Sequence, residues 1–288
     1  MSLLRKVAGC KGQATSPPSL DSRGRVTLHK KLLFLNSERL LVIQTRPWWQ
    51  KAGVTLLDFF LPRLCVFCGE VARGEAPAAV CTTCEGKIEW VASPLCPCCG
   101  RVFPNRDGAD HLCGPCQTDA PPFARARAAT LYDDDGPSGQ AIKRFKYSRR
   151  LDMLPVMHHW LRSPLCLELV HDADLVAPVP LHPSRLRQRG FNQALLLAQA
   201  FPKVPLEREL LARQRHTPPQ AGLNPKERRD NVKGAFGVPR PDLVKGKRIL
   251  LIDDVFTTGA TVKECARVLR RADAREIDVL TVARVRYD

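Results

Sequence analysis

The sequence contains no apolar segment long enough to cross a membrane as a helix. Such a helix needs roughly 18 consecutive apolar residues, and charged residues interrupt every apolar run among the 288 residues of the chain. The run from Leu32 to Gln44, for example, contains Glu38 and Arg39. This pattern excludes a transmembrane role and predicts that the protein does not insert into a membrane.

A secretory signal peptide is also missing from the first residues. The stretch Val7-Ala8-Gly9-Cys10 has the small residues that precede a lipoprotein cysteine. Arg5 and Lys6, however, stand where a signal peptide needs its apolar segment. The sequence therefore predicts a cytoplasmic protein.

Several common catalytic motifs are absent as well. The sequence has no G-x-x-x-x-G-K, H-E-x-x-H or G-x-G-x-x-G, so P-loop nucleotide hydrolysis, zincin chemistry and dinucleotide binding have no support. Aromatic residues make up only 6% of the chain, which leaves few surfaces for stacking nucleic-acid bases. The candidate general bases His158, His159, His182 and His216 lack metal-ligand spacing, and lone histidines are more often structural.

Positive charge is in excess, but it is unevenly distributed. The chain has 45 Lys and Arg against 29 Asp and Glu, a net charge of +16, so we expect an acidic partner that carries phosphate groups. Residues 1–56 carry +8, residues 57–120 carry −3 and residues 121–288 carry +11. Residues 1–56 also lack a sustained helical or strand period, which predicts a flexible basic arm.

Cysteines are concentrated in residues 57–120, which hold nine of the twelve. Eight of them form four pairs with two residues between the members: Cys65 and Cys68, Cys81 and Cys84, Cys96 and Cys99, Cys113 and Cys116. This spacing lets a tight turn direct both sulfurs at one ion. Because cytosolic thiols stay reduced, we interpret the pairs as metal ligands rather than disulfides.

Eight thiolates form two closed zinc sites, and a closed site has no open position at which water could be activated. We therefore predict a double zinc ribbon with two structural Zn2+ ions. Neighbouring pairs are the simplest ligand sets, although an interleaved arrangement or an iron-sulfur cluster also fits the spacing. The net charge of −3 favours a structural or docking module over one that attracts phosphates itself.

From Pro121 onward, apolar strands alternate with helical patterns, which indicates a mostly parallel sheet flanked by helices. The expected strands are 127–132, 174–181, 248–252 and 277–285, and the expected helices are 138–147, 193–200 and 262–272. We expect three parts: the arm over 1–56, the double zinc ribbon over 57–120 and the α/β domain over 121–288.

The strongest chemical signal is the stretch from Arg248 to Thr261. An apolar strand leads into Asp253 and Asp254, and the loop Thr257-Thr258-Gly259 connects it to a helix. Backbone N–H groups at a helix N-terminus hold phosphate, and glycine permits close approach. Adjacent carboxylates can accept hydrogen bonds from ribose hydroxyls, directly or through Mg2+ and its waters. The stretch therefore predicts a site for a sugar phosphate.

This stretch resembles the phosphoribosyl-pyrophosphate (PRPP) signature of type I phosphoribosyltransferases, and the whole chain from about residue 56 onward is similar to the ComF (ComFC) family. The further matches are Ala141 to Tyr147, Val179 to Pro183, Arg187 to Gln193, and the run from Arg213 through Thr217 and Gln220 to Asn231. A cysteine-pair ribbon ahead of such a domain is also that family's arrangement. The first 50 or so residues have no counterpart in it.

The resemblance assigns roles to individual residues. It makes Asp253 and Asp254 the catalytic contacts to ribose and metal, and it places the 5-phosphate on Thr257, Thr258, Gly259, Ala260 and Thr261. The loop after Pro180 corresponds to the pyrophosphate-binding loop. Candidates for binding pyrophosphate or nucleic-acid phosphate are therefore Arg185, Arg187 and Arg189, helped by Lys143 and Lys146.

Two functions follow from the resemblance. The first is a phosphoribosyltransferase that binds PRPP with Mg2+, and whose acceptor is unidentified. Purine-type members have an aspartate where this chain has Thr257, which weakens a purine-salvage role. The second is a non-catalytic competence protein that binds single-stranded DNA, with Phe145, Tyr147 and Phe191 as the available stacking platforms. A DNA-uptake role would also imply a partner such as a competence helicase.

Overall fold

The computed structural model describes residues 63–72, 79–105, 107–217 and 224–286. The arm predicted over residues 1–56 and the cysteine at position 10 lie outside the described residues. Residues 63–288 form one unit by their internal contacts. Among the described residues, no helix combines the length and the hydrophobicity that a membrane crossing requires.

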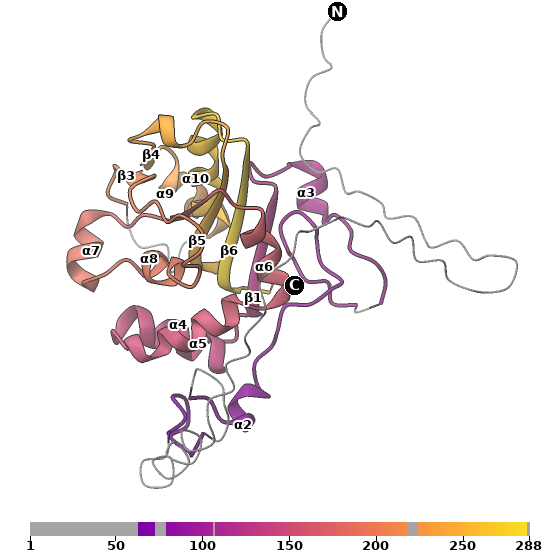
Figure 1. Cartoon of the computed structure of the whole chain (residues 1–288). Helices are drawn as coiled ribbons and strands as arrows, with labels where there is room; N and C mark the ends of the chain where they lie inside the picture. Colours follow the sequence, from indigo (N-terminus) through magenta and orange to yellow (C-terminus); the bar gives the residue numbers. More distant parts are fainter. Residues whose placement is uncertain (1–62, 73–78, 106, 218–223, 287–288) are drawn as a thin grey trace, which may run out of the picture. The chain divides into compact units, whose positions relative to one another are not determined.

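The α/β part is built around one sheet of four strands (Figure 1). In spatial order they are β1 (Arg125–Leu131), β6 (Glu276–Arg284), β5 (Arg248–Phe256) and β2 (Leu175–Pro178). All neighbouring strands run parallel, so their carboxyl ends meet at one edge of the sheet. The mostly parallel sheet predicted from the sequence is confirmed.

The connections between these strands contain most of the helices. The elements there are α4 (Pro137–Tyr147), η1 (Leu151–Met153), α5 (Leu154–Leu161), α6 (Pro164–His171), α7 (Pro183–Arg189), α8 (Gln193–Ala198), α9 (Pro225–Val232), η2 (Pro241–Leu243) and α10 (Ala260–Arg271), with the antiparallel strand pair β3 (Ala212–Arg213) and β4 (Phe236–Gly237).

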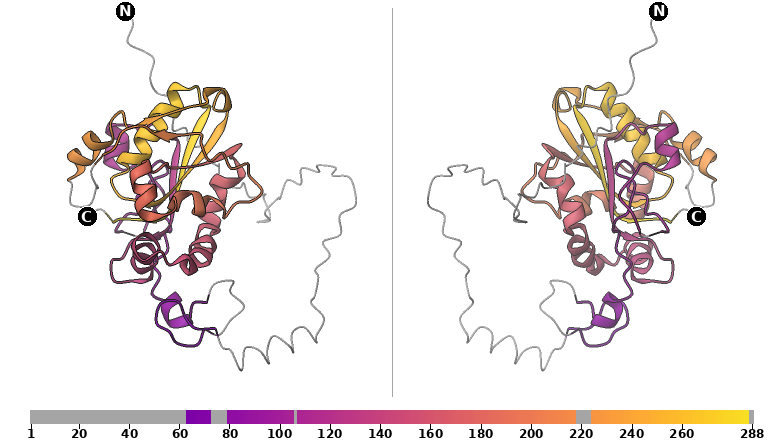
Figure 2. Two further views of the ribbon diagram at one scale, coloured as in Figure 1. Left: turned by 90° about the vertical axis from the view of Figure 1, so that its left-hand side faces the viewer. Right: turned by 90° about the vertical axis from the view of Figure 1, so that its right-hand side faces the viewer.

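Helices cover both faces of the sheet (Figure 2). In β5, Ile249 and Leu251 belong to one buried cluster with α10, whereas Leu250 and Ile252 belong to a second cluster with α4, α5, α6 and α8. Successive strand side chains point to opposite faces, and burial on both faces explains why the strand sequence is continuously apolar.

Strand β5 is longer than predicted. The apolar run ends at Ile252, but Asp253 and Val255 continue the parallel pairing with Thr281 and Ala283 of β6. The two carboxylates therefore lie inside the strand rather than after it. This pairing fixes the backbone that carries them.

Two short helices belong to the cysteine-rich part, α2 (Thr82–Glu85) and α3 (Gly114–Thr118). The ligand atoms of each cysteine set lie within 4.8 Å of one another, and the sets are Cys65, Cys68, Cys81, Cys84 and Cys96, Cys99, Cys113, Cys116. Sulfurs arranged tetrahedrally at about 2.3 Å from zinc would be separated by about 3.8 Å. The Sγ atoms of Cys68 and Cys81 lie 3.6 Å apart, as do those of Cys99 and Cys113. Neighbouring pairs thus form two closed sites that fit zinc.

The cysteine-rich part is bound to the α/β part along β1. The N–H of Ala126 donates to the carbonyl of Cys98 at 2.7 Å, and the N–H of Leu131 donates to the carbonyl of Glu89 at 2.7 Å. Trp90 also forms an antiparallel bridge with Thr130. Because β1 is an edge strand, these bonds satisfy backbone groups that would otherwise face solvent or another chain.

Candidate functional site

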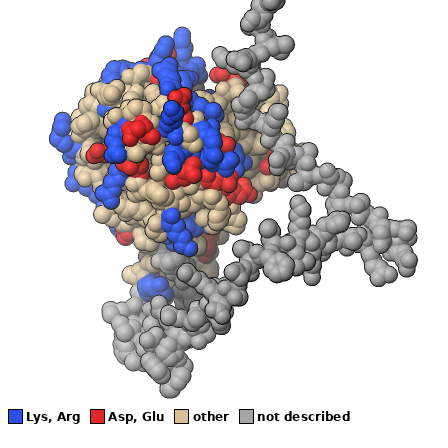
Figure 3. All heavy atoms as spheres, turned by 45° about the horizontal axis from the view of Figure 1, so that its top comes forward, with Lys and Arg blue, Asp and Glu red and all other residues tan. Residues whose placement is uncertain are grey.

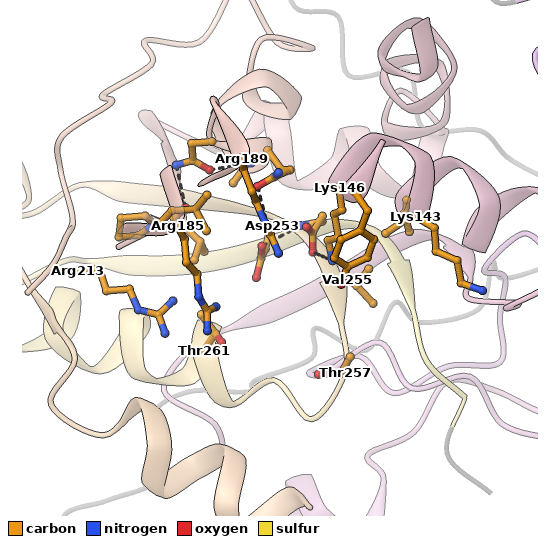
Figure 4. A pocket seen from close by; sticks show the side chains of 18 of the residues that line it. Lys143, Lys146, Arg185, Arg189, Arg213, Asp253, Val255, Thr257 and Thr261 are labelled. Atoms are coloured by element: carbon orange, nitrogen blue, oxygen red, sulfur yellow. Dashed lines mark hydrogen bonds and ion pairs between the residues drawn. The ribbon is translucent and has the colours of Figure 1, made fainter. Parts of the chain in front are cut away.

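A cavity of about 660 Å³ opens where β5 and β2 end, the usual ligand position in parallel sheets. Its charged lining residues come from α4, α7, β3, α9, β5 and the connections between them: Lys143, Lys146, Arg149, Arg185, Arg189, Arg213, Arg228, Asp253 and Asp254. Among the described residues, seven cations and two carboxylates thus line this cavity, and Figure 4 shows Lys146, Arg185 and Arg189 near Asp253. Such a lining favours an anionic ligand with a part that interacts with carboxylates.

The two aspartates have different surroundings. The Oδ1 atom of Asp254 lies 2.8 Å from Nζ of Lys146, and both side chains are largely buried. The backbone N–H of Asp254 donates to Oδ1 of Asp253 at 2.9 Å. Burial, followed by repulsion from Asp254, raises the pKa of Asp253 from 3.8 to about 7. One carboxylate is therefore paired with a cation, while the other is costly to ionise.

The loop after β5 has the geometry of an anion site. Gly259 adopts a left-handed conformation, with φ of 72°, and immediately precedes α10 without a side-chain cap for the helix. A Cβ atom at Gly259 would lie 2.6 Å from Cζ of Phe256. Thr257 and Thr261 line the cavity; Thr258 contributes a weak hydrogen bond, in which its Oγ1 accepts from the N–H of Ala260 at 3.4 Å. The start of this twelve-residue helix can bind a phosphate group.

Helix α7 supplies part of the basic wall. Arg185 donates from Nη2 to the carbonyl of Thr217 at 3.1 Å, and Arg189 donates from Nη1 to Oε1 of Gln193 at 3.1 Å. Arg187 is exposed on the same helix and does not line the cavity. Figure 4 shows Arg185 and Arg189 gathered near Asp253 and Thr261.

The two lysines of α4 form ion pairs with different aspartates. Lys146 reaches Asp254, whereas Lys143 points away from Asp253 (Figure 4) and forms an ion pair with Asp134 at 2.8 Å. Both line the cavity. Lys146 is therefore the lysine that can influence the carboxylate pair.

Sequence reasoning did not select Arg213 and Gln193 for the site. Arg213 is buried, donates to Oγ1 of Thr217 at 2.5 Å and lies 5.3 Å from the ring centre of Phe236. Among the described residues, Nε of Arg213 and Nε2 of Gln193 are buried without a hydrogen-bond partner. Both side chains line the cavity. Arg213 is the first residue of a stretch that resembles the ComF family, and this resemblance was the sequence signal that could have assigned Arg213 to the site.

The three candidate aromatic platforms differ in exposure: Phe145 is buried, Phe191 is partly buried and Tyr147 is exposed. Phe145 is buried, and its ring centre lies 5.2 Å from that of Phe191. Tyr147 is 71% exposed and lines the cavity, with the guanidinium carbon of Arg189 5.8 Å from its ring centre. Tyr147 is therefore the residue on which a planar ligand could stack at the mouth of the cavity.

The histidines have structural contacts. Nε2 of His158 lies 2.9 Å from the carbonyl of Leu196, and burial lowers the pKa of its imidazole. His182 precedes α7 and accepts from the N–H of Ser184 through Nδ1 at 3.3 Å. Neither His158 nor His182 lines the cavity.

We expect Gly259→Ala to reduce the free energy of unfolding more than Gly246→Ala does. Both glycines have nearly the same positive φ, but a Cβ atom at Gly246 would meet nothing within 4 Å. The left-handed conformation alone costs about 1–2 kcal/mol, and overlap with Phe256 should bring the loss at Gly259 to about 3–4 kcal/mol. Urea unfolding measures both values. Equal losses would show that the Phe256 ring does not constrain the turn.

We expect Asp253→Asn to stabilise the protein at pH 8. The folded-state pKa of about 7 exceeds the ordinary 3.8, so between these two pH values the folded protein retains a proton that the unfolded chain releases, and wild-type stability rises as pH falls from about 7 towards 3.8. The gain in the variant should therefore be about 2–3 kcal/mol larger at pH 8 than at pH 5. Asp254→Asn, which leaves Lys146 without its partner, should give no gain. Urea unfolding at the two pH values tests this contrast, and a pH-independent loss in Asp253→Asn would contradict it.

Comparison with known protein families supports this architecture. Residues 56–123 match the family described as Double zinc ribbon domain, and residues 188–287 match the family described as Phosphoribosyl transferase domain. The match to the first family agrees with the two structural zinc sites formed by the cysteine sets.

Three relatives match between 71% and 80% of this chain. Competence protein F of Haemophilus influenzae is 30% identical over 80% of this chain and 100% of its own length. DNA utilization protein YhgH of Escherichia coli K12 is 32% identical over 78% of this chain and 98% of its own length. Competence protein ComFC of Bacillus subtilis is 25% identical over 71% of this chain and 84% of its own length. The chain therefore belongs to the ComF family of competence and DNA-utilization proteins, which combine a double zinc ribbon with a phosphoribosyltransferase domain.

Proposed function

We propose that the cavity binds PRPP together with Mg2+ and transfers its phosphoribosyl group to an acceptor. The observation that carries this proposal is the convergence of two carboxylates, a helix-start loop and a basic wall on one cavity of about 660 Å³. PRPP carries phosphates at both ends of a ribose, so it needs anion-binding groups on both sides of a hydroxyl-binding centre.

Each part of the cavity suits one part of PRPP. The 5-phosphate binds at the loop through Thr257, Thr261 and the first N–H groups of α10. Asp253 and Asp254 accept hydrogen bonds from the ribose hydroxyls. Arg185, Arg189 and the buried Arg213 face the pyrophosphate.

The residues present also fit a magnesium ion. Mg2+ prefers hard oxygen ligands and commonly binds through one or two carboxylates plus substrate phosphates, and Asp253 and Asp254 supply such oxygens beside the basic wall. When bound, Mg2+ neutralises negative charge on the pyrophosphate. Lys146 already pairs with Asp254, so its ammonium group would have to release that oxygen when the ion binds.

The same residues can stabilise the transition state of phosphoribosyl transfer. The bond from the anomeric carbon to the pyrophosphate oxygen breaks, and its electron pair leaves with pyrophosphate while positive charge develops on the sugar. A lone pair of the acceptor forms the new bond to the anomeric carbon, and the acceptor's proton passes to solvent. Asp253 and Asp254 stabilise that charge electrostatically, while Arg185 and Arg189 stabilise the leaving group. Because Thr257 cannot accept the acceptor's proton as an aspartate would, the acceptor has to be a nucleophile that does not depend on a base at this position.

Calorimetric titration with PRPP and Mg2+ tests this proposal. We expect the wild type to bind and Asp253→Asn combined with Asp254→Asn to lose binding. Arg185→Gln should weaken binding about 10- to 100-fold, because a hydrogen bond to a charged group contributes about 1.5–3 kcal/mol. Arg187→Gln, on the same helix but outside the cavity, is the matched control and should stay within about twofold of wild type. Absence of binding to the wild type would refute the proposal.

A second candidate function is the binding of single-stranded DNA at the mouth of the cavity. The exposed Tyr147 beside Arg189 offers a base-stacking platform next to a basic wall, and the relatives are named for competence and DNA utilization. On the face in Figure 3, basic side chains lie among acidic ones, so net charge alone does not identify a binding face there. Such a role would place the protein in DNA uptake, where a competence helicase is a suitable partner.

Oligonucleotides with and without bases test this second function. We expect Tyr147→Leu to weaken binding of single-stranded DNA about tenfold or more, because a stacked base contributes about 1–3 kcal/mol. It should leave binding of an abasic strand of equal length unchanged, and Tyr147→Phe should behave like wild type. Arg187→Glu with Arg189→Glu should weaken binding of both strands and reduce its salt dependence. Affinity for DNA that does not fall with rising salt would rule out this function.

A further inference from the structure

The described residues contain a buried arginine outside the cavity that joins the second cysteine set to the phosphate loop. Arg284 is the last residue of β6 and is 3% exposed. It lies opposite Leu131 of β1 on one side and Phe256 of β5 on the other. Its side chain therefore sits at the carboxyl end of the sheet, where both the cavity and the cysteine-rich part begin.

On one side, Arg284 binds the backbone of the second cysteine set. Its Nη1 donates to the carbonyl of Cys99 at 2.6 Å. The next residue, Gly100, has φ of 70°, and a Cβ atom there would lie 2.3 Å from the carbonyl oxygen of Ala126 and 3.2 Å from Nη1 of Arg284. The turn that carries Cys99 is thus packed directly against the sheet and the guanidinium group.

On the other side, Arg284 contacts the residue that supports the phosphate loop. Its guanidinium carbon lies 5.2 Å from the ring centre of Phe256, within the range of a cation–π interaction. Phe256 is 6% exposed and contacts Phe123 edge to face. Its ring lies so close to Gly259 that no Cβ atom would fit there. The ring is therefore packed directly against the left-handed turn that starts α10.

We propose that Arg284 is a positioning residue that couples zinc binding at the second cysteine set to the conformation of the phosphate loop. Zinc holds the turn at Cys99, the Cys99 carbonyl orients the Arg284 guanidinium group, and the guanidinium group holds Phe256 against Gly259. This inference rests on the proposed function only where it concerns PRPP affinity; the coupling between metal and loop is independent of it. This coupling gives the second cysteine set a role in ligand binding besides its role in folding.

The same interface provides a matched control. Arg127 is also buried and donates from Nη1 to the carbonyl of Pro97 at 2.9 Å. It belongs to β1 and binds the same turn of the second cysteine set, but no contact between it and Phe256 is found in the described part of the chain. Loss of Arg127 should weaken the attachment of the ribbon, whereas loss of Arg284 should also release the phosphate loop.

Coupling of this kind is reciprocal, because two ligands that favour one conformation favour each other's binding. A ligand bound at the phosphate loop should therefore raise the zinc affinity of the second cysteine set. The experiment measures the equilibrium transfer of zinc from the full chain to a chromogenic chelator, with and without PRPP and Mg2+. Cys68→Ser, which impairs the first set, shows which part of the titration belongs to the second set.

We expect PRPP to raise the zinc affinity of the second set about fivefold or more in the wild type and in Arg127→Met. In Arg284→Met this increase should disappear, and the Kd for PRPP should rise about tenfold. Arg284→Lys, which keeps the cation, should restore part of both effects. A merely structural role for Arg284 would predict equal changes in Arg284→Met and Arg127→Met, and that result would overturn the inference.

Hydrogen exchange separates this inference from the proposed function and does not require PRPP. Stripping zinc from the wild type should increase exchange at the backbone amides of residues 259–262. In zinc-loaded Arg284→Met these amides should already exchange faster, while in zinc-loaded Arg127→Met they should not.

If PRPP fails to bind but this pattern holds, only the proposed function fails. If the loop amides do not respond to zinc removal, the coupling is refuted, whatever PRPP does. A wild-type loop that does not respond to zinc removal refutes the coupling even if a variant does not fold.

Discussion

The unfavourable burial of adjacent negative charges is the constraint around which the cavity is organised. Asp253 is held by its pairing with Thr281 of β6, and Asp254 follows it within the same strand, so neither can move away without disrupting β5. Lys146 compensates one of them, and the pKa of the other is raised to about 7. Because a buried carboxylate pair is costly, the cations that surround it contribute to holding the folded state as well as to attracting an anion.

The cysteine-rich part covers the edge of the sheet that is formed by β1. Strand β1 pairs with β6 on one side, and on the other its N–H groups are satisfied by the carbonyls of Glu89 and Cys98. The first set is attached elsewhere, where Arg144 of α4 donates to the carbonyl of Val66 at 2.6 Å. Both sets thus present backbone carbonyls to arginines of the α/β part, so metal-dependent turns become part of the interface.

Much of this arrangement could be predicted from the sequence, because its signals are local. The cysteine spacing predicted two metal sites, and the apolar run before Asp253 predicted a buried strand. Helices α5, α6, α7 and α9 are only seven or eight residues long, which gives too few turns for a clear helical period. The spacing of charges also could not distinguish Arg185 from Arg187, since which residue faces the cavity depends on how α7 is oriented in the fold.

Local sequence patterns could not predict contacts between residues that are far apart in the sequence. Arg213 reaches the cavity through a two-residue strand with no detectable period. Arg284 resembles any basic residue at the end of a strand until Cys99 and Phe256 are brought beside it. Its contact with Cys99 spans 185 positions of sequence, so no motif search could have revealed it.

The placement of β1 also determines the order in which the protein can be assembled during synthesis. Its pairing partner β6 comes much later in the sequence, and the bond between Arg125 and Asp278 spans 153 positions. The sheet therefore stays incomplete until β6 has been synthesised. The cysteine-rich segment emerges before β1 and can bind zinc at once, so it is available to shield one side of this strand on the ribosome. Such early protection would limit the aggregation to which slowly completed parallel sheets are prone.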